Sequence, residues 1–287
     1  AGGNNNRMKE LTHKRAVAAM PIAGSYRSID FALSNMTNSH IQKVAVLTQY
    51  NARSLNEHLN SSKWWNFGRK QGGLYVFTPT ITNDNGYWYR GTADAIYQNM
   101  DFLKKSHEPY VVIASGDAVY KMDYSKVLQY HIDKKADVTV VCKEMDPSDD
   151  VSRFGTIRMD DDMRITEFEE KPMVTKSNMI STGIYVIRRR LLIDLIEHAA
   201  EEERFDFVND VLIRYKNLKK IYGYKIDHYW SNIATVDAYY KTNMDFLKPE
   251  VRNYFFKQDP EIYSKVSDLP PAKYNPGASV KNSLVGS

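Results

Sequence analysis

The sequence predicts an α/β fold with a mixed, mainly parallel sheet, and two patterns in its 287 residues lead to that prediction. Short, nearly continuous apolar runs rich in β-branched residues are typical of buried parallel strands, and they occur at 43–48, 110–114 and 137–143. Between these runs, apolar residues recur at helical spacing, as in the stripe at 96–103. Because strands that alternate with helices build layered sheets, we expect helices on both faces.

The remaining elements are predicted in chain order from the same two patterns. Apolar stripes at helical spacing predict helices at 29–36, 96–103, 127–132, 191–203, 206–216 and 236–247. Short apolar or alternating runs predict further strands at 154–158, 165–169, 179–188 and 220–226. After Pro249 the pattern is irregular and ends in the chain breakers Pro270, Pro271, Pro276 and Gly277. We therefore expect one domain over 1–248 and a linker over 249–276.

The balance of charges and the single cysteine exclude several classes of protein. The formal net charge is only +4 and basic residues are dense only at 188–190, which argues against a nucleic-acid-binding domain. No apolar run approaches the ~20 residues that a membrane span needs. Cys142 is the only cysteine, which excludes an internal disulfide framework and a cysteine-based zinc site. We expect a cytoplasmic protein that binds neither nucleic acid nor membranes.

The first residues of the chain are the first candidate for a ligand contact. Gly2 and Gly3 let the backbone approach a phosphate closely and present its N–H groups to it. The guanidinium of Arg7 offers a bidentate phosphate contact. A flexible, asparagine-rich turn is the alternative interpretation of this segment.

A carboxylate follows one of the predicted strands, at the edge where open sheets bind ligands. Asp117 comes just after the strand at 110–114 and is well placed to hold Mg²⁺ on a nucleotide phosphate. The alternative is a turn residue or a helix N-cap.

Two further segments combine polar side chains with predicted element ends. Gly91 and Thr92 begin the helix at 96–103, where free N–H groups bind polar ligand edges, although an ordinary N-cap is an equal alternative. Glu170 and Lys171 end a strand and suit a sugar phosphate, and Ser181 begins the next strand and adds a hydroxyl. A solvated charged face is the alternative for the Glu–Lys pair.

The order of these motifs resembles the sugar-1-phosphate nucleotidyltransferases, and in particular the glucose-1-phosphate adenylyltransferase family of glycogen synthesis. The resemblance covers nearly the whole chain. Its motifs are found at 9–12, 26–35, 46–50, 88–98, 115–120, 170–172, 181–186 and 269–273. No single motif decides, but the ordered set makes a chance match implausible.

The resemblance implies a Rossmann-like nucleotidyltransferase domain that couples ATP with glucose 1-phosphate and releases ADP-glucose and pyrophosphate. It implies that catalysis depends on positioning and on charge neutralisation by Mg²⁺ and basic side chains. Asp117 is the implied metal ligand and Arg7 a second catalytic residue. The implied binding residues are Gly2, Gly3, Gly91 and Thr92 for the nucleotide, and Tyr89, Glu170, Lys171 and Ser181 for the sugar phosphate.

Several departures from the family pattern concern charged groups. Active members have an arginine where this chain has Asn4, a lysine near Val17, and at Asn232 an aspartate that is the second carboxylate for Mg²⁺. A glutamine that reads the base is not evident near 78–79. Because one carboxylate binds a cation more weakly than two, we expect a weakened Mg²⁺ site.

These losses, with the sugar-side motifs kept, resemble regulatory-type subunits that assemble with a catalytic paralogue, and the segment at 65–74 is similar to that branch. We expect such a subunit in a hetero- or homo-tetramer, with weak or no activity of its own. A self-sufficient adenylyltransferase and a sugar nucleotidyltransferase with another nucleotide remain as alternatives.

The two ends of the chain are expected to continue in a longer protein. The sequence has no initiator methionine and opens on the glycine loop, so we expect an upstream strand. The resemblance implies a left-handed β-helix domain after the linker. Residues 277–287 are expected to be its beginning, with most of that domain missing.

Overall fold

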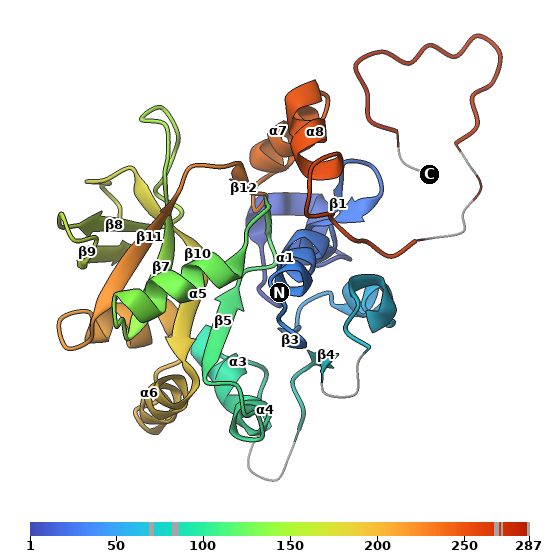
Figure 1. The fold of residues 1–287 in the computed structure, drawn as a ribbon. Helices are drawn as coiled ribbons and strands as arrows, with labels where there is room; N and C mark the ends of the chain where they lie inside the picture. Colours follow the sequence, from blue (N-terminus) through green and yellow to red (C-terminus); the bar gives the residue numbers. More distant parts are fainter. Residues whose placement is uncertain (69–71, 82–85, 267–269, 271, 286–287) are drawn as a thin grey trace. The chain divides into compact units, whose positions relative to one another are not determined.

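The computed structural model describes residues 1–68, 72–81, 86–266, 270 and 272–285 (Figure 1). Parts of two sequence motifs, at 69–71, 269 and 271, lie outside the described residues. The chain forms two compact units. The first contains residues 1–78, 116–123 and 228–287, and the second contains residues 79–115 and 124–227.

The first unit is built from short elements around helix α1. Its strands are β1 (Pro21–Ile22), β2 (Tyr26–Arg27), β3 (Lys43–Leu47), β4 (Gly73–Phe77), β6 (Ala118–Tyr120) and β12 (Trp230–Asn232). Its helices are η1 (Asn6–Thr12), η2 (Val17–Ala19), α1 (Ser28–Asn38), α2 (Arg53–His58), η3 (Ser62–Trp65), α7 (Val236–Asp245) and α8 (Pro249–Phe256). Strands β3 and β4 pair in parallel, whereas β1 with β2 and β6 with β12 are antiparallel.

The prediction that the chain is irregular after Pro249 is wrong for its first residues, because they form helix α8. Proline at the first helical position is favourable, since its missing N–H has no partner there in any helix. Phe255 of α8 is fully buried and packs edge-on against Phe31 of α1, with 5.4 Å between ring centroids. The start of the predicted linker is therefore part of the core of the first unit.

The second unit is a sheet with helices packed against it. Its strands are β5 (Tyr110–Ala114), β7 (Val138–Glu144), β8 (Gly155–Met159), β9 (Ile165–Glu170), β10 (Met179–Arg188) and β11 (Ile221–Ile226). Its helices are α3 (Thr92–Gln98), α4 (Met100–Lys104), α5 (Tyr124–Asp133), α6 (Arg189–Glu201) and η4 (Phe207–Ile213). The strand order is β11-β7-β10-β8-β9, and β5 also pairs with β10.

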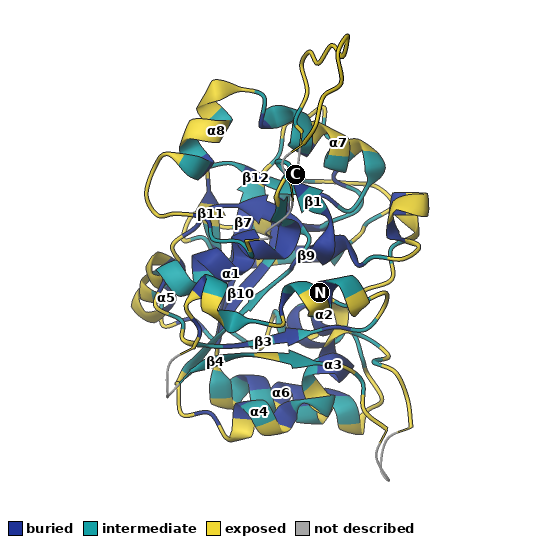
Figure 2. Cartoon of the chain, turned by 90° about the vertical axis from the view of Figure 1, so that its right-hand side faces the viewer, coloured by how far each residue is buried: buried dark blue, intermediate teal, exposed yellow. Residues whose placement is uncertain are grey.

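Strand β10 is the centre of this sheet. It pairs with β7 along one edge, and β8 and β5 share its other edge. Most of its residues are buried, whereas the helices of this unit carry exposed residues (Figure 2). Apolar and β-branched residues on both sides of Gly183 favour a strand here, although Ser181, Thr182 and Gly183 interrupt the apolar run.

The α/β class and the mixed sheet are confirmed, but the predicted predominance of parallel pairing is not. Among the pairings of the described strands, six are antiparallel and two are parallel. Strands β5 and β7 were expected to be parallel, yet β5 pairs antiparallel with β10, and β7 pairs parallel with β11 but antiparallel with β10. Burial on both faces makes a strand apolar whichever direction its neighbour runs, so the pattern could not give the direction.

The helix predicted at 206–216 is in part a π-helix, η4. A π-helix of this length is rare, and π-helical turns are frequently found at functional sites. Among the described residues, no helix combines the length and the apolar character that crossing a membrane requires.

Candidate functional site

In the first unit, the segment that carries Asp117 lies between α1 and β12. The Oγ of Ser28 donates to the carbonyl of Gly116 at 2.9 Å, and the N–H of Ile233 donates to the carbonyl of Asp117 at 2.9 Å. Asn232 pairs with Ala118, the neighbour of Asp117, across the β6–β12 ladder. The structure therefore places Asp117, the predicted metal ligand, next to the strand of Asn232, which stands at the predicted second-ligand position, and Asp117 is partly exposed.

The amide of Asn232 also supports its own backbone. Its Oδ1 accepts from the N–H of Ala234 at 3.1 Å, in the turn before α7. The carbonyl of Ala234 in turn accepts from Nδ2 of Asn5 at 2.9 Å. The N-terminal loop is thereby attached to the end of the strand that carries Asn232.

The two glycines of the N-terminal loop have different surroundings. A Cβ on Gly2 would lie 2.7 Å from the backbone nitrogen of Gln49, which is closer than real Cβ contacts, so glycine is needed there for packing. A Cβ on Gly3 would meet nothing within 4 Å. Asn4 and Arg7 are exposed beside it. The backbone of Gly3 is thus the open part of the predicted phosphate loop.

The loop and the Asp117 segment lie close together in this unit. A Cβ added at Gly116 would be 3.4 Å from the Cβ of Ala1 and 2.9 Å from Cδ1 of Ile29. Glycine at position 116 therefore allows three segments to meet: the loop, α1 and the segment of Asp117.

The Asp117 segment offers one carboxylate to the expected Mg²⁺. Among the described residues, no group of three or more His, Cys, Asp or Glu side chains is arranged to hold a metal ion. Mg²⁺ is usually held by one or two carboxylates together with substrate phosphates and water. One carboxylate and one amide oxygen fit that arrangement weakly, and Asp117 and Asn232 would be the protein ligands.

Val17 lies inside the first unit. Its side chain is 8% exposed and belongs to an apolar cluster that includes Met8, Met20, Phe31 and Ile233. In this chain the position contributes to the core, and the surrounding side chains are large and apolar.

In the second unit, the start of α3 is occupied by contacts within the chain. The N–H groups of Ala93 and Asp94 both point to the carbonyl of Phe205, at 2.8 and 3.4 Å. The Oγ1 of Thr92 accepts from the N–H of Phe207 at 2.9 Å. The expectation of free N–H groups at this helix start is therefore corrected at Ala93 and Asp94. A Cβ on Gly91 would be 2.3 Å from that same carbonyl, which explains the glycine.

Asp94 organises the segment before α3. Its side chain is almost fully buried and accepts from the N–H of Arg90 at 2.8 Å, from Nη2 of Arg90 at 3.2 Å and from Nε2 of Gln98 at 2.9 Å. The hydroxyl of Tyr89 accepts from Nδ2 of Asn99 at 2.9 Å, and partial burial raises the pKa of Tyr89. The motif is thus fixed by its own polar side chains.

Glu170 and Lys171 form an ion pair at the end of β9. The distance between Nζ and Oε1 is 3.1 Å, and the Lys171 side chain is 58% exposed, against 15% for Glu170. Lys171 has φ of 47°, which ends the strand and turns the chain. A Cβ on Gly155, opposite Glu170, would lie 2.9 Å from its Oε2. The Lys171 ammonium is therefore exposed, and its partner carboxylate is largely buried.

Ser181 lies in β10 just before a register shift. Its hydroxyl is buried and lies 3.2 Å from the hydroxyl of Tyr185, and burial raises the pKa of that tyrosine well above its usual range. Gly183, between them, has φ of 75°, and its carbonyl accepts from the N–H of Ser115 at 3.1 Å. At the register shift, β10 is thus bonded to Ser115, the residue that follows β5. The hydroxyl of Ser181 already has a partner inside the unit, the hydroxyl of Tyr185.

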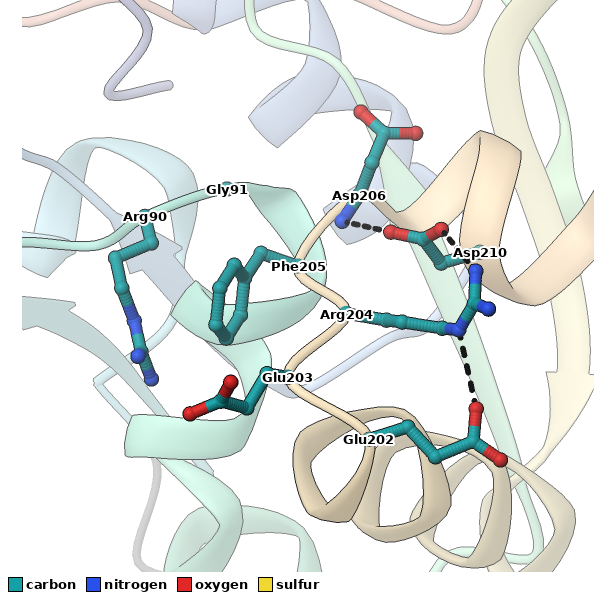
Figure 3. Close-up of a pocket in the computed structure, with 8 residues that line it drawn as sticks. All are labelled: Arg90, Gly91, Glu202, Glu203, Arg204, Phe205, Asp206 and Asp210. Carbon is teal, nitrogen blue, oxygen red and sulfur yellow. Dashed lines mark hydrogen bonds and ion pairs between the residues drawn. The ribbon is translucent and has the colours of Figure 1, made fainter.

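A cavity of about 510 Å³ lies beside the start of α3 (Figure 3). It is lined by Arg90, Gly91, Glu202, Glu203, Arg204, Phe205, Asp206 and Asp210. The guanidinium of Arg90 stacks on the ring of Phe205 at 3.8 Å, and Arg204 pairs with Glu202 and Asp210. Four carboxylates against two guanidinium groups disfavour a phosphate in this cavity.

Comparison with known proteins places this chain among nucleotide-transferring enzymes. A family model described as nucleotidyl transferase matches residues 1–249. The chain is 40% identical to a glucose-1-phosphate adenylyltransferase of Clostridium novyi over 99% of its length and 75% of the relative. Relatives of the same name from Thermosipho melanesiensis (39%, over 69% of the relative) and Bacillus anthracis (41%, over 76%) are similar. This chain belongs to the glucose-1-phosphate adenylyltransferase family.

For a member of this family, the structure divides the predicted site residues between two units. The first unit brings together Gly2, Gly3, Asp117 and Asn232, with Arg7 exposed on the following helix. The second unit holds Tyr89, Gly91, Thr92, Glu170, Lys171 and Ser181. Within the second unit, the first three lie in or next to α3 and the other three in the β9–β10 region.

Sequence reasoning missed three features of these regions. It did not find the supporting role of Asn5, the contacts of Phe205 with the start of α3, or the cavity beside them. Each depends on residues more than a hundred positions apart, so no local pattern carried the signal.

Proposed function

We propose that this chain is a regulatory-type subunit of a glucose-1-phosphate adenylyltransferase of glycogen synthesis, with weak or no activity alone. The complete reaction is that of ATP with glucose 1-phosphate to give ADP-glucose and pyrophosphate. The proposed partner is a catalytic paralogue in a cytoplasmic tetramer. The proposal combines the family membership with the loss of charged groups at three positions.

The residues of this chain have defined parts in the proposed chemistry. Gly3 presents an open backbone to a phosphate, and Arg7 supplies a positive charge nearby. Gly91 and Thr92 bind the nucleotide, and Tyr89 and Ser181 contribute to the sugar-phosphate site. Bound Mg²⁺ would neutralise phosphate charge, with Asp117 as its carboxylate ligand.

On the sugar side, the exposed ammonium of Lys171 binds the phosphate of glucose 1-phosphate, and Glu170 orients that lysine. An ammonium on a flexible stem is a suitable point charge for a phosphate. In the reaction, an oxygen of that sugar phosphate attacks the α-phosphorus of ATP in line, and pyrophosphate leaves. The chain's contribution to this step is positioning and charge.

The observation that carries the regulatory assignment is Asn232. It is paired beside the Asp117 segment, where the family pattern has a second carboxylate, and its Oδ1 already accepts from Ala234. An amide oxygen offers a cation only a dipole, so the site has one anionic ligand instead of two. A loss of several kcal/mol in the transition state lowers a rate by orders of magnitude.

Val17 supports the same assignment. A lysine at this position in active members would bring a cation towards the phosphates, whereas here the side chain is buried among apolar residues. Asn4, exposed in the loop, is uncharged. Two cations are thus absent from the side where the triphosphate is proposed to bind.

The deciding experiment measures ADP-glucose formation by the purified chain, alone and mixed with its catalytic paralogue. We expect little turnover alone, and a change in the paralogue's rate or effector response in the mixture. Turnover alone at a rate ordinary for enzymes would contradict the regulatory assignment and favour a self-sufficient adenylyltransferase, for which the retained Asp117, Glu170 and Lys171 are the supporting observation. Parallel assays with UTP and dTTP test the alternative of another nucleotide.

A gain-of-function variant tests the physical reason. Asn4→Arg with Asn232→Asp should raise the rate alone by roughly tenfold or more, because both add charge where the transition state needs it. Adding Val17→Lys should raise it further but lower stability, since an ammonium then enters an apolar cluster. The matched control is Asn217→Arg with Asn275→Asp, which makes the same charge changes at exposed positions outside the proposed site. An equal increase in rate in the control would show that the added charges do not act through the proposed site.

A further inference from the structure

We propose that Ser28 and Asn35 of helix α1 are positioning residues that hold the segment of Asp117 in place for a metal-bound nucleotide. The inference rests on the proposed function, in which Asp117 is the carboxylate ligand of that metal. It assigns a task to two buried polar side chains that do not themselves belong to the binding site.

Ser28 holds the beginning of the segment. It is fully buried at the first position of α1, and its Oγ donates to the carbonyl of Gly116 at 2.9 Å. Its own N–H donates to the carbonyl of Met20 at 3.1 Å, which fixes the start of the helix. Because Gly116 has no side chain, its backbone lies directly against Ile29 of the same helix.

Asn35 holds the end of the segment. It is fully buried two turns after Ser28, so both side chains lie on one face of α1. Its Nδ2 donates to the carbonyl of Tyr120 at 3.2 Å, and its Oδ1 accepts from the N–H of Met122 at 3.1 Å. One helix face therefore holds the backbone on both sides of Asp117.

Helix α1 is itself fixed by a buried carboxylate, Asp30. Its Oδ2 accepts from the N–H of Arg27 at 2.8 Å and from Oγ of Ser264 at 2.6 Å, and its Oδ1 lies 2.6 Å from Nε2 of His58. Asp30 is fully buried. A helix held this firmly can transmit its position to the segment that it contacts.

The position of Asp117 matters more in this chain than where two carboxylates share the metal. With Asn232 as its neighbour, a displacement of Asp117 is not compensated by a second anionic ligand. A shift of about 1 Å in a ligating group is enough to weaken a site severely. Loss of the Ser28 or Asn35 contact should therefore appear in the metal-dependent part of nucleotide binding.

The test compares two buried serines on the same helix. Ser28→Ala removes the contact to Gly116. Ser34→Ala is the matched control, because Ser34 is also fully buried, yet its hydroxyl bonds Tyr263, donating to the carbonyl at 3.2 Å and accepting from the N–H at 2.8 Å. Both variants lose a buried hydroxyl, and only one touches the Asp117 segment.

Two readouts are used on the full chain. Calorimetry gives the dissociation constant of ATP in Mn²⁺ and in EDTA, and the ratio of the two is the metal-dependent gain. Hydrogen exchange by mass spectrometry reports the backbone of 116–122 and of 261–265. We expect Ser28→Ala to reduce the gain about threefold or more, with faster exchange at 116–122. Ser34→Ala should leave the gain within about twofold, with faster exchange at 261–265.

Asn35→Asp is the second variant, and it keeps the acceptor for Met122 while losing the donor to Tyr120. It should lower the metal-dependent gain as Ser28→Ala does. Equal losses of gain in Ser28→Ala and Ser34→Ala, or unchanged exchange at 116–122 in Ser28→Ala, would overturn the positioning role. A wild-type chain whose ATP affinity is the same in Mn²⁺ and EDTA would refute the proposed metal site. In that case, faster exchange at 116–122 in Ser28→Ala but not in Ser34→Ala would still support the contact of Ser28 with this backbone. Equally fast exchange in both variants would overturn it.

Discussion

The clearest stability test concerns Asp94, whose carboxylate holds Arg90 and the start of α3. The change Asp94→Asn keeps the size of the side chain and removes its charge. The carboxylate is 2% exposed and the arginine partner 42% exposed, so the pair is buried on one side only. Breaking a fully buried pair costs about 3–5 kcal/mol. Because the exposed arginine recovers hydration, we expect a loss of about 2–3 kcal/mol in the free energy of unfolding.

The same unit contains a matched control for that change. Asp101 and Lys105 form an ion pair at the same spacing of four residues, with an Nζ to Oδ2 distance of 3.1 Å, but their side chains are 81% and 76% exposed. Asp101→Asn should leave stability within the error of measurement. Urea unfolding followed by circular dichroism measures both variants. Equal midpoints for the two would refute the argument that burial makes the Asp94 pair strong.

Two further predictions concern a buried histidine and the N-terminal loop. Burial lowers the pKa of His131 to about 4, so the unfolded chain takes up its proton first as the pH falls below 6.5. The free energy of unfolding should drop by roughly 2–3 kcal/mol between pH 6.5 and pH 4. Urea titrations of His131→Gln should show that much less dependence on pH. An unchanged dependence on pH would contradict the prediction. Gly2→Ala should cost about 1–3 kcal/mol in thermal or urea unfolding, because its Cβ would lie 2.7 Å from Gln49 N. Gly3→Ala, with open space around it, should be tolerated, and equal losses would argue against the close approach at Gly2.

The sequence predicted the existence of elements better than their pairing. The runs at 43–48, 110–114 and 179–188 correspond to β3, β5 and β10, because their β-branched and apolar residues form a pattern that is local to each strand. The antiparallel pairing of β5 with β10 joins residues some seventy positions apart, and neither strand carries a sign of its neighbour's direction. Helix α8 was missed because a proline that breaks one helix also begins the next.

The candidate site was predictable where a motif places a polar group at the end of an element. Asp117 after β5 and Glu170 at the end of β9 are of this kind. The support of Asp117 by Ser28 and Asn35 could not be predicted, since a buried serine in an apolar helix has many possible partners. The register of β12 against β6, which brings Asn232 beside Asp117, likewise appears only in three dimensions.

The path of the chain through the two units has a consequence for how the protein can form. Asp117 lies in an eight-residue insertion, 116–123, that enters the first unit with second-unit sequence on both sides. Its ladder partner, β12, is synthesised more than a hundred residues later. A nascent chain therefore completes the second unit's sequence before the strand that pairs with the Asp117 segment exists. Cutting the gene at one point can release neither unit intact, and during synthesis the sequence of the first unit is the last to be completed.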